Sequence, residues 1–206
     1  MPGTGGNSEP LSEPLAAPDP LTQFRRWFDQ ARLVVQDPEA MAVATVDQQG
    51  RPSVRMVLMR SFGEQGFVFH TNYDSRKGTE LAHNPEVALL FHWAPLSRQV
   101  RVEGPAERIP ADESDAYFAG RPRGAQIAAW ASHQSRTIGS RDQLDARVYE
   151  RAAAYAGHEV PRPPWWGGLR VEPRTFEFWQ NRDDRLHDRL QYRREPGGWR
   201  MERLQP

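Results

Sequence analysis

The sequence predicts a mainly β protein of the α+β class, an antiparallel barrel, closed or split, with peripheral helices. Short apolar runs with the period of two typical of strands recur along the chain, and turns such as 63–66 and 196–198 separate them. About seven to eight such runs, interrupted by helices, favour a barrel over alternating β and α units. No G-x-G-x-x-G sequence follows a predicted strand, which argues against a Rossmann dinucleotide site.

The first 20 residues differ in composition from the rest of the chain. Residues 1–20 hold five prolines and neither lysine nor arginine, which predicts a disordered or loosely docked tail. We expect residues 21–206 to form one domain. From Leu21 the apolar residues recur at helical spacing, and the predicted helix ends near Gln36, before Asp37–Pro38.

The remaining elements follow in order. Strands are expected at 41–46, 53–60 and 67–71 as an antiparallel meander, then at 87–92 and 99–107, with a short helix from Lys77 to about His83. A helical section follows at 112–118, 125–131 and 140–156, with a basic loop at 121–124. Strands return at 169–172, 175–180, 188–194 and 199–204, after a loop at 161–168.

Composition excludes several classes of function. The formal net charge is zero, so no overall field attracts nucleic acid or an anionic membrane surface. The absence of cysteine excludes disulfides, thiolate metal sites and a cysteine nucleophile, and the histidine spacing indicates no metal site. No apolar run approaches the roughly 20 residues that span a bilayer, and no secretory signal begins the chain. A cytoplasmic protein is therefore expected.

Lys77 is the only lysine among 27 basic residues. Coding bias is the simple explanation for the excess of arginine, but the position of the one lysine is informative. Lys77 lies in Ser75-Arg76-Lys77-Gly78, just where a helix is expected to begin. Hydroxyl groups, two cations and the backbone N–H groups of a helix N-terminus together suit a phosphate group. The alternative is a solvated basic turn.

Further basic clusters are less specific. Arg55 and Arg60 share the second predicted strand. Proline stiffens the loop Arg121-Pro122-Arg123, which preorganises an arginine, although an ordinary surface loop would look the same. Gln134 and Ser135 could donate hydrogen bonds to an anion.

The C-terminal segment Arg185-Leu186-His187-Asp188-Arg189 places three cationic or titratable residues at i, i+2 and i+4. If this segment is extended, Arg185, His187 and Arg189 lie on one face, where their mutual repulsion favours an anion among them. That pattern predicts a pocket for a phosphorylated or otherwise anionic small molecule. His187 could instead be a surface residue of an edge strand, and Trp179 could belong to the core.

Several short blocks of this chain, in their order, resemble those of one enzyme family, the pyridoxine (pyridoxamine) 5′-phosphate oxidases, which are FMN enzymes with a split barrel. The resemblance covers roughly residues 20–206. Its most specific blocks are Arg55–Leu58, Thr71–Gly78, Arg98–Val100, Tyr117–Phe118 with Arg121–Arg123, Gln134–Ser135, Trp166–Gly168, Glu177–Trp179 with Arg185–Arg189, and the C-terminal residues 202–206.

The resemblance implies a homodimer with FMN at the subunit interface. It assigns the flavin phosphate to Arg55, Arg76, Lys77 and Ser135, and other cofactor contacts to Met56, Val57, Leu58, Arg60, His70, Thr71, Gln99, Gln134, Trp179 and Arg189. It assigns the substrate phosphate to Tyr117 and Arg121, with Arg60 and Ala125 beside them, and the catalytic positions over the pyridine ring to Arg185 and His187. The implied reaction oxidises the C4′ alcohol or amine of a phosphorylated vitamin B6 compound to the aldehyde, with O₂ as acceptor and H₂O₂ as product.

Three positions depart from the family pattern. Arg60 stands where lysine is common, His70 where tyrosine or phenylalanine is common, and Ala125 where some members have serine. These changes bear on the substrate more than on FMN. Two alternatives remain: a related FMN oxidase acting on another aromatic ring, of the phenazine type, and a non-catalytic flavin-binding or pyridoxal-phosphate carrier protein.

Overall fold

The computed structural model describes residues 10–206, which form five α-helices, nine strands and two 3-10 turns. The helices are α1 (Pro20–Val34), α2 (Arg76–His83), α3 (Ala111–Ala119), α4 (Arg123–Ala131) and α5 (Arg141–Ala154). The strands are β1 (Ala40–Val46), β2 (Pro52–Gly63), β3 (Gly66–Asn72), β4 (Glu86–Trp93), β5 (Arg98–Arg108), β6 (Trp166–Val171), β7 (Thr175–Gln180), β8 (Asp188–Glu195) and β9 (Gly198–Arg203). The 3-10 turns are η1 (Ala94–Leu96) and η2 (Asp183–Arg185).

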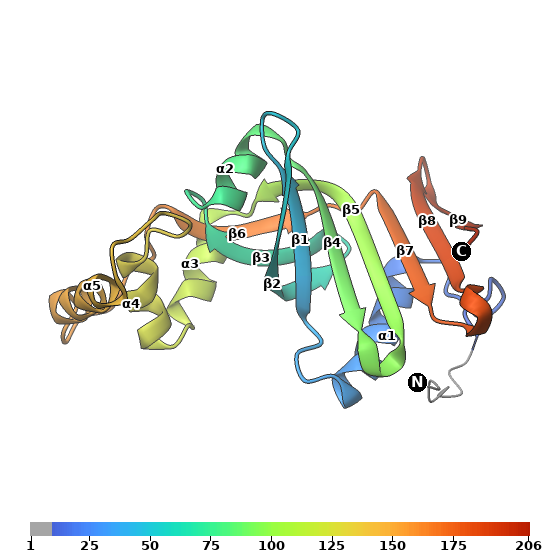
Figure 1. Ribbon diagram of the computed structural model, residues 1–206, viewed down its shortest axis with the longest axis horizontal. Helices are drawn as coiled ribbons and strands as arrows, with labels where there is room; N and C mark the ends of the chain where they lie inside the picture. Colours follow the sequence, from blue (N-terminus) through green and yellow to red (C-terminus); the bar gives the residue numbers. More distant parts are fainter. Residues whose placement is uncertain (1–9) are drawn as a thin grey trace.

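The strands form one antiparallel sheet in the order β4-β1-β2-β3-β6-β5-β7-β8-β9. Because β4 also pairs with β5, strands β1 to β6 close into a barrel of six strands. Strands β7, β8 and β9 continue the sheet outward from β5. This arrangement confirms the predicted antiparallel barrel with peripheral helices (Figure 1).

Alternating side chains fill the barrel. Met41 and Val43 of β1 point inward and are fully buried, as their period-two pattern predicts. Helix α1 inserts Phe24 into this core, where its ring centroid lies 4.9 Å from that of Phe67 and 5.0 Å from that of Phe91. Asp19 caps α1 by accepting a hydrogen bond from the Thr22 N–H at 2.7 Å. The core is therefore closed on one side by α1.

Strand β5 divides its pairing between the barrel and the outer strands. Its residues 98–103 pair with β7, whereas Ala106 to Arg108 pair with β6. Gly104 lies where this change occurs, and a Cβ there would be 1.9 Å from the Glu172 carbonyl oxygen. Only glycine lets the corner between β6 and β7 approach β5 so closely.

Most predicted elements are confirmed with shifts of one to three residues at their ends. The structure has nine strands among the described residues, one at each of the nine ranges named from the sequence, although the overall estimate had been about seven to eight. Arg123 and Gly124 begin helix α4 and do not belong to the predicted basic loop. Pro122 explains this difference, since proline is favoured beside the first turn of a helix.

Part of the predicted N-terminal tail is packed against the domain. Leu11 and Ala17 are buried, and the Ala17 carbonyl oxygen accepts a 2.7 Å hydrogen bond from the Tyr192 hydroxyl. Arg203 pairs with Glu13 at 2.7 Å. Residues 1–9 of the predicted tail lie outside the described residues.

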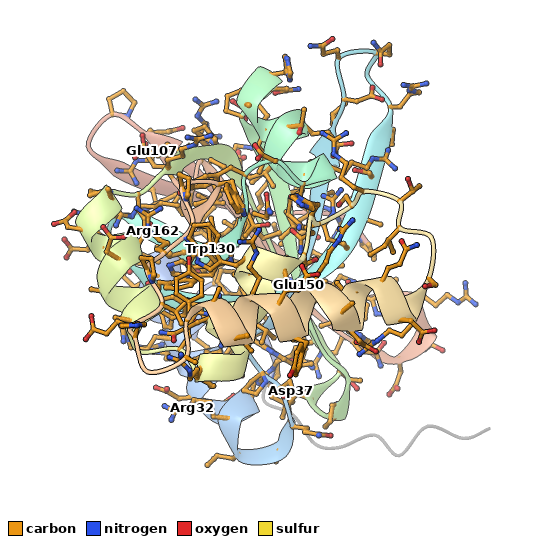
Figure 2. The ribbon with its side chains drawn as sticks, turned by 90° about the vertical axis from the view of Figure 1, so that its left-hand side faces the viewer. Arg32, Asp37, Glu107, Trp130, Glu150 and Arg162 are labelled. Carbon is orange, nitrogen blue, oxygen red and sulfur yellow. The ribbon has the colours of Figure 1, made fainter. Side chains whose placement is uncertain are left out.

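Helices α3, α4 and α5 gather at one end of the molecule, and β7 to β9 lie at the other end with the C-terminus (Figure 1). Figure 2 looks onto the helical end, where α5 crosses the front of the molecule and Trp130 of α4 is labelled behind it. Trp130 packs on Trp165 in a smaller apolar cluster that also contains Phe118 and Ile127. Within residues 10–206, no helix is long and apolar enough to cross a membrane, and no group of acidic and histidine side chains is arranged to hold a metal ion.

Candidate active site

A cavity of about 350 Å³ opens between the barrel and helices α3 and α4. This volume is in the range of sites for small molecules. Residues predicted from the sequence for cofactor and substrate line it together: Met56, Val57, Leu58, Arg60, His70, Thr71, Lys77, Tyr117, Arg121, Ala125 and Gln134. Five separate segments of the chain, β2, β3, α2, α3–α4 and the loop after α4, thus meet at one place.

The cavity is strongly cationic. Arg60, Lys77 and Arg121 line it, and none of the described aspartates or glutamates does. Arg60 lies at the β-bulge of β2, where the register with β3 shifts between Met59 and Ser61. Bulges of this kind redirect a side chain next to a functional site. Three cations without a carboxylate favour an anionic ligand.

Unpartnered polar atoms are concentrated at this cavity. Among the described residues, the buried side-chain nitrogen or oxygen atoms without a hydrogen-bond partner are both ring nitrogens of His70 and one Nη atom of Arg121. Buried polar atoms are nearly always paired, so a cluster of exceptions indicates a site whose partners come from elsewhere.

Aromatic rings form one wall of the cavity. The ring centroids of His70 and Tyr117 lie 3.8 Å apart with the planes 12° from parallel, and the Arg121 guanidinium lies 4.4 Å from the centre of Trp166. Burial, together with the charges of Arg60 and Arg121, lowers the pKa of His70 to about 4, so this imidazole is neutral at physiological pH. Burial also lowers the pKa of Arg121, and the electrostatic interaction with Tyr117 acts in the opposite direction by raising it.

Helix α2 presents its N-terminus beside the cavity. Ser75 caps the helix by accepting a 3.3 Å hydrogen bond from the Gly78 N–H. Lys77, only 7% exposed, donates hydrogen bonds of 3.1 Å to Thr71 Oγ1 and of 3.1 Å to Gln134 Oε1. Burial and the charge of Arg55 lower the pKa of Lys77 to about 8. Within residues 10–206 this buried ammonium group has no carboxylate partner, which suits it to an incoming anion.

Two other predicted phosphate ligands lie next to the cavity. Arg76 and Ser135 line an adjoining groove. Arg55 donates hydrogen bonds to Thr45 Oγ1 and Ser53 Oγ, both at 2.5 Å, and does not line the cavity. The guanidinium of Arg55 is therefore engaged within the protein.

The remaining predicted residues form a second group on the outer strands. Gln99 of β5 pairs in register with Trp179 of β7, and Trp179 pairs with Arg189 of β8. Arg189 donates a 2.7 Å hydrogen bond from Nε to Glu177, whose other oxygen pairs with Arg101 at 2.5 Å. Strands β7 and β8 lie at the end of the molecule opposite helices α3 to α5 (Figure 1).

Arg185, His187 and Arg189 were expected to share one face only if their segment is extended, and this condition is not met. Asp183–Arg185 form the turn η2, in which Asp184 and Arg185 have positive φ angles of 55° and 62°, and β8 begins only at Asp188. The His187 ring accepts a 3.2 Å hydrogen bond from the Arg182 N–H through Nδ1, and its centroid is 4.6 Å from that of Trp179. Arg185 is exposed and projects from a turn.

An apolar patch on β2 and β4 adjoins the cavity. Val54 and Met56 are 68% and 64% exposed, and Leu58 and Leu90 are also exposed. The register places Met56, Ala42 and Leu90 side by side across β2, β1 and β4. A contiguous exposed apolar patch of this kind is typical of a protein–protein interface.

Sequence reasoning did not single out Glu80 and Glu177 as separate candidates. Each is buried and accepts hydrogen bonds from two arginines. The spacing of four residues between Arg76 and Glu80 in a predicted helix is a signal that could have identified the first of them.

The barrel and its cationic cavity define a split-barrel protein with a site suited to an anionic ligand. The chain belongs to the pyridoxamine 5′-phosphate oxidase family. Residues 28–154 match the family model described as pyridoxamine 5′-phosphate oxidase, and residues 166–206 match the pyridoxine 5′-phosphate oxidase C-terminal dimerisation region.

Similar proteins agree with this assignment. The pyridoxine/pyridoxamine 5′-phosphate oxidase of Rubrobacter xylanophilus is 56% identical over 197 residues, which cover 95% of this chain and 91% of the relative. That of Streptomyces avermitilis is 55% identical over 205 residues, which cover 96% of this chain and 92% of the relative. The crystal structure of PhzG from Burkholderia lata, in complex with tetrahydrophenazine-1-carboxylic acid, has a TM-score of 0.90 at 34% identity and covers 98% of this chain and 100% of that one.

Proposed function

We propose that this chain is an FMN-dependent oxidase that converts pyridoxine 5′-phosphate and pyridoxamine 5′-phosphate to pyridoxal 5′-phosphate. The alcohol and O₂ give the aldehyde and H₂O₂; the amine also consumes water and releases ammonia. The observation that carries the proposal is the cavity with three cations, no carboxylate and the unpartnered atoms of His70 and Arg121. Relatives named as this oxidase, more than half identical to the chain, support it.

The residues present fit FMN. Lys77 and Arg76 follow one another at the N-terminus of α2, which suits a phosphate monoester, while Thr71 and Gln134 can hydrogen-bond the rest of the cofactor. The cofactor, when bound, supplies the two-electron acceptor that amino-acid side chains lack. The protein supplies orientation and charge.

The second phosphate, that of the substrate, suits the opposite wall of the cavity. Tyr117, Arg121 and Arg60 are the residues for it, and Ala125 leaves space without a hydroxyl group. The neutral His70 ring stacks on Tyr117 and holds the phenol in place. Holding the phosphate fixes the position of the ring to be oxidised.

The remaining roles require a second copy of the chain. Strands β7 and β8, which carry Trp179 and Arg189 and are joined by the segment with Arg185 and His187, lie at the other end of the molecule from helices α3 and α4, and Gln99 lies on β5 opposite Trp179 (Figure 1). A homodimer that buries the apolar patch of Val54, Met56, Leu58 and Leu90 would bring the outer strands of one protomer to the cavity of its partner. The match of residues 166–206 to a dimerisation region supports this arrangement. In it, Arg185 and His187 would cover the substrate ring, and Trp179 and Arg189 would contact the flavin.

A second candidate is an oxidase of the same family acting on another aromatic ring. The 34% identity to PhzG and its TM-score of 0.90 favour keeping this candidate. The pair of Tyr117 and Arg121, with Arg60 beside it, favours a phosphorylated substrate instead, because a phosphate dianion offers two arginines and a phenol more charge and more acceptor oxygens than a single carboxylate does.

The test is an aerobic assay of the FMN-loaded protein with each 5′-phosphate, following both aldehyde and H₂O₂. We expect turnover with at least one 5′-phosphate and little with the unphosphorylated vitamers. A full flavin spectrum without turnover of either phosphate would refute the proposed reaction. Tetrahydrophenazine-1-carboxylic acid in the same assay tests the second candidate.

A further inference from the structure

Glu80 is a buried carboxylate beneath the site that we assign to the FMN phosphate. It lies on α2, is 5% exposed, and faces β1 and β2. Oε2 accepts hydrogen bonds from Thr45 Oγ1 at 2.5 Å and from Ser53 Oγ at 2.6 Å, and lies 3.3 Å from Arg55 Nη2. Its other oxygen accepts a 2.8 Å hydrogen bond from Arg76 Nε. One side chain thus joins α2 to two strands of the barrel.

The hydrogen bond to Glu80 orients Arg76 and leaves its two Nη groups available to bind a ligand. Arg76 is tied through Nε alone, its side chain is 58% exposed, and its two Nη groups have no partner among the described residues. A guanidinium held by Nε presents both Nη groups as a fork, which is the geometry that binds two oxygens of a phosphate. Arg55, by contrast, has both Nη groups engaged by Val43, Thr45, Ser53 and Glu80.

The local charges are consistent with a phosphate ligand. Arg55, Arg76 and Lys77 carry three positive charges, and Glu80 is the carboxylate that directly pairs with two of them. Burial by itself would raise the pKa of Glu80, but hydrogen bonds from Ser53, Thr45, Arg76 and Arg55 outweigh it and hold that pKa at about 2. These four side chains therefore carry a net charge of about +2, equal and opposite to a phosphate dianion. The other charged residues that line the groove, Asp47, Asp74, Arg51 and Arg136, cancel one another.

We propose that Glu80 is a positioning residue for the cofactor phosphate: it fixes Arg76 in an open fork and holds the N-terminus of α2 against β1 and β2. It touches neither substrate nor flavin. Its effect is preorganisation, because an arginine that is already ordered loses less side-chain entropy when the phosphate binds. This inference rests on the proposed function, since it takes FMN as the cofactor.

The test compares FMN with riboflavin, which has the same ring system and no phosphate. Dissociation constants of both are measured on the full-length apoprotein by flavin fluorescence quenching. In Glu80→Ala we expect FMN to bind about tenfold or more weakly, with riboflavin changed less than twofold. Glu80→Gln should bind FMN within about threefold of the wild type, because an amide oxygen can still accept from Arg76 Nε while the NH₂ group donates to the hydroxyls.

A matched control is available on α5. Arg141 and Asp145 form an ion pair of the same spacing and the same 2.8 Å Nε–oxygen distance, exposed and away from the cavity. Asp145→Ala should leave both dissociation constants unchanged.

The outcomes distinguish an error in the cofactor assignment from an error in the role of Glu80. A wild type that binds FMN no better than riboflavin would overturn the cofactor assignment itself. The positioning role would be overturned if Glu80→Ala kept the wild-type preference for FMN over riboflavin, or if it lost affinity for both flavins equally. Either result would leave the proposed function standing. Thermal unfolding of each apoprotein identifies a variant that fails to fold. If Glu80→Ala does not fold, the ratio of the FMN and riboflavin dissociation constants of Glu80→Gln decides. A ratio within threefold of the wild-type ratio supports the positioning role, and a larger loss of FMN binding overturns it.

Discussion

Replacing Lys77 by methionine should stabilise the apoprotein at neutral pH while weakening FMN binding. The ammonium group is buried, has no carboxylate partner in the described part of the chain, and has a pKa of about 8 instead of 10.5. At 1.36 kcal/mol for each pH unit, this difference corresponds to roughly 3.4 kcal/mol for keeping the buried group charged. Methionine removes that cost but also loses the hydrogen bonds to Thr71 and Gln134, about 1 kcal/mol each. A net stabilisation of roughly 1 kcal/mol at pH 7 follows.

The pH dependence gives a sharper result because it does not depend on the hydrogen-bond energies. Between pH 8 and 10.5 the unfolded chain still holds the proton of Lys77 while the folded chain has released it. Stability rises with pH wherever the unfolded state binds more protons, so the wild type gains stability over this window and Lys77→Met does not. The difference in free energy of unfolding between the wild type and Lys77→Met should shift by about 2 to 3 kcal/mol from pH 7 to pH 10, in favour of the wild type.

Urea unfolding of both apoproteins, at one protomer concentration and at several pH values, measures this difference. In parallel, FMN should bind the wild type progressively more weakly above pH 8, as Lys77 loses its charge, while its affinity for Lys77→Met should be low and nearly independent of pH. A stability difference that stays constant from pH 7 to pH 10 would refute the assignment of a depressed pKa to Lys77.

Three further predictions concern other parts of the molecule. Arg185→Ala should lower turnover of the 5′-phosphate at least tenfold and leave the flavin content of the purified protein nearly unchanged, because Arg185 is assigned to the substrate side; equal loss of flavin would contradict this. Gly104→Ala should lower the free energy of unfolding by about 1–3 kcal/mol, since its Cβ would lie 1.9 Å from the Glu172 carbonyl oxygen, whereas Gly124→Ala, where the new Cβ meets nothing within 4 Å, should not lower stability. Met56→Glu should shift the protein from dimer to monomer in light scattering, because Met56 is central to the exposed apolar patch, and an unchanged mass would locate the interface elsewhere.

The elements of the barrel could be predicted because their signals are local. The alternation of buried and exposed residues in β1 and β5 requires only the period of a strand, and the cap of α2 requires only Ser75 three residues before Gly78. The composition of the cavity was likewise predicted from short blocks, since Thr71, Lys77, Tyr117 and Arg121 are all present where the structure brings them together.

The turn at Asp183–Arg185 could not be predicted in this way. A spacing of i, i+2 and i+4 is compatible with a strand, but positive φ angles at Asp184 and Arg185 reverse the chain before β8 begins. Neither residue is glycine, so the sequence carried no strong sign of a left-handed conformation. Arg189 and His187 consequently have separate partners, Glu177 and the Arg182 backbone.

Residue types and short spacings thus determined the class of this protein, an antiparallel barrel carrying arginine, lysine and tyrosine side chains suited to phosphate groups. Tertiary structure alone decided how those charges are used. It places Lys77 in a buried position with a lowered pKa, engages Arg55 within the protein, and leaves Arg76 open above Glu80. The physical reason is that burial and charge pairing depend on neighbours far apart in the chain, such as Thr45 and Glu80, whereas a strand or a helix cap depends on neighbours a few residues away.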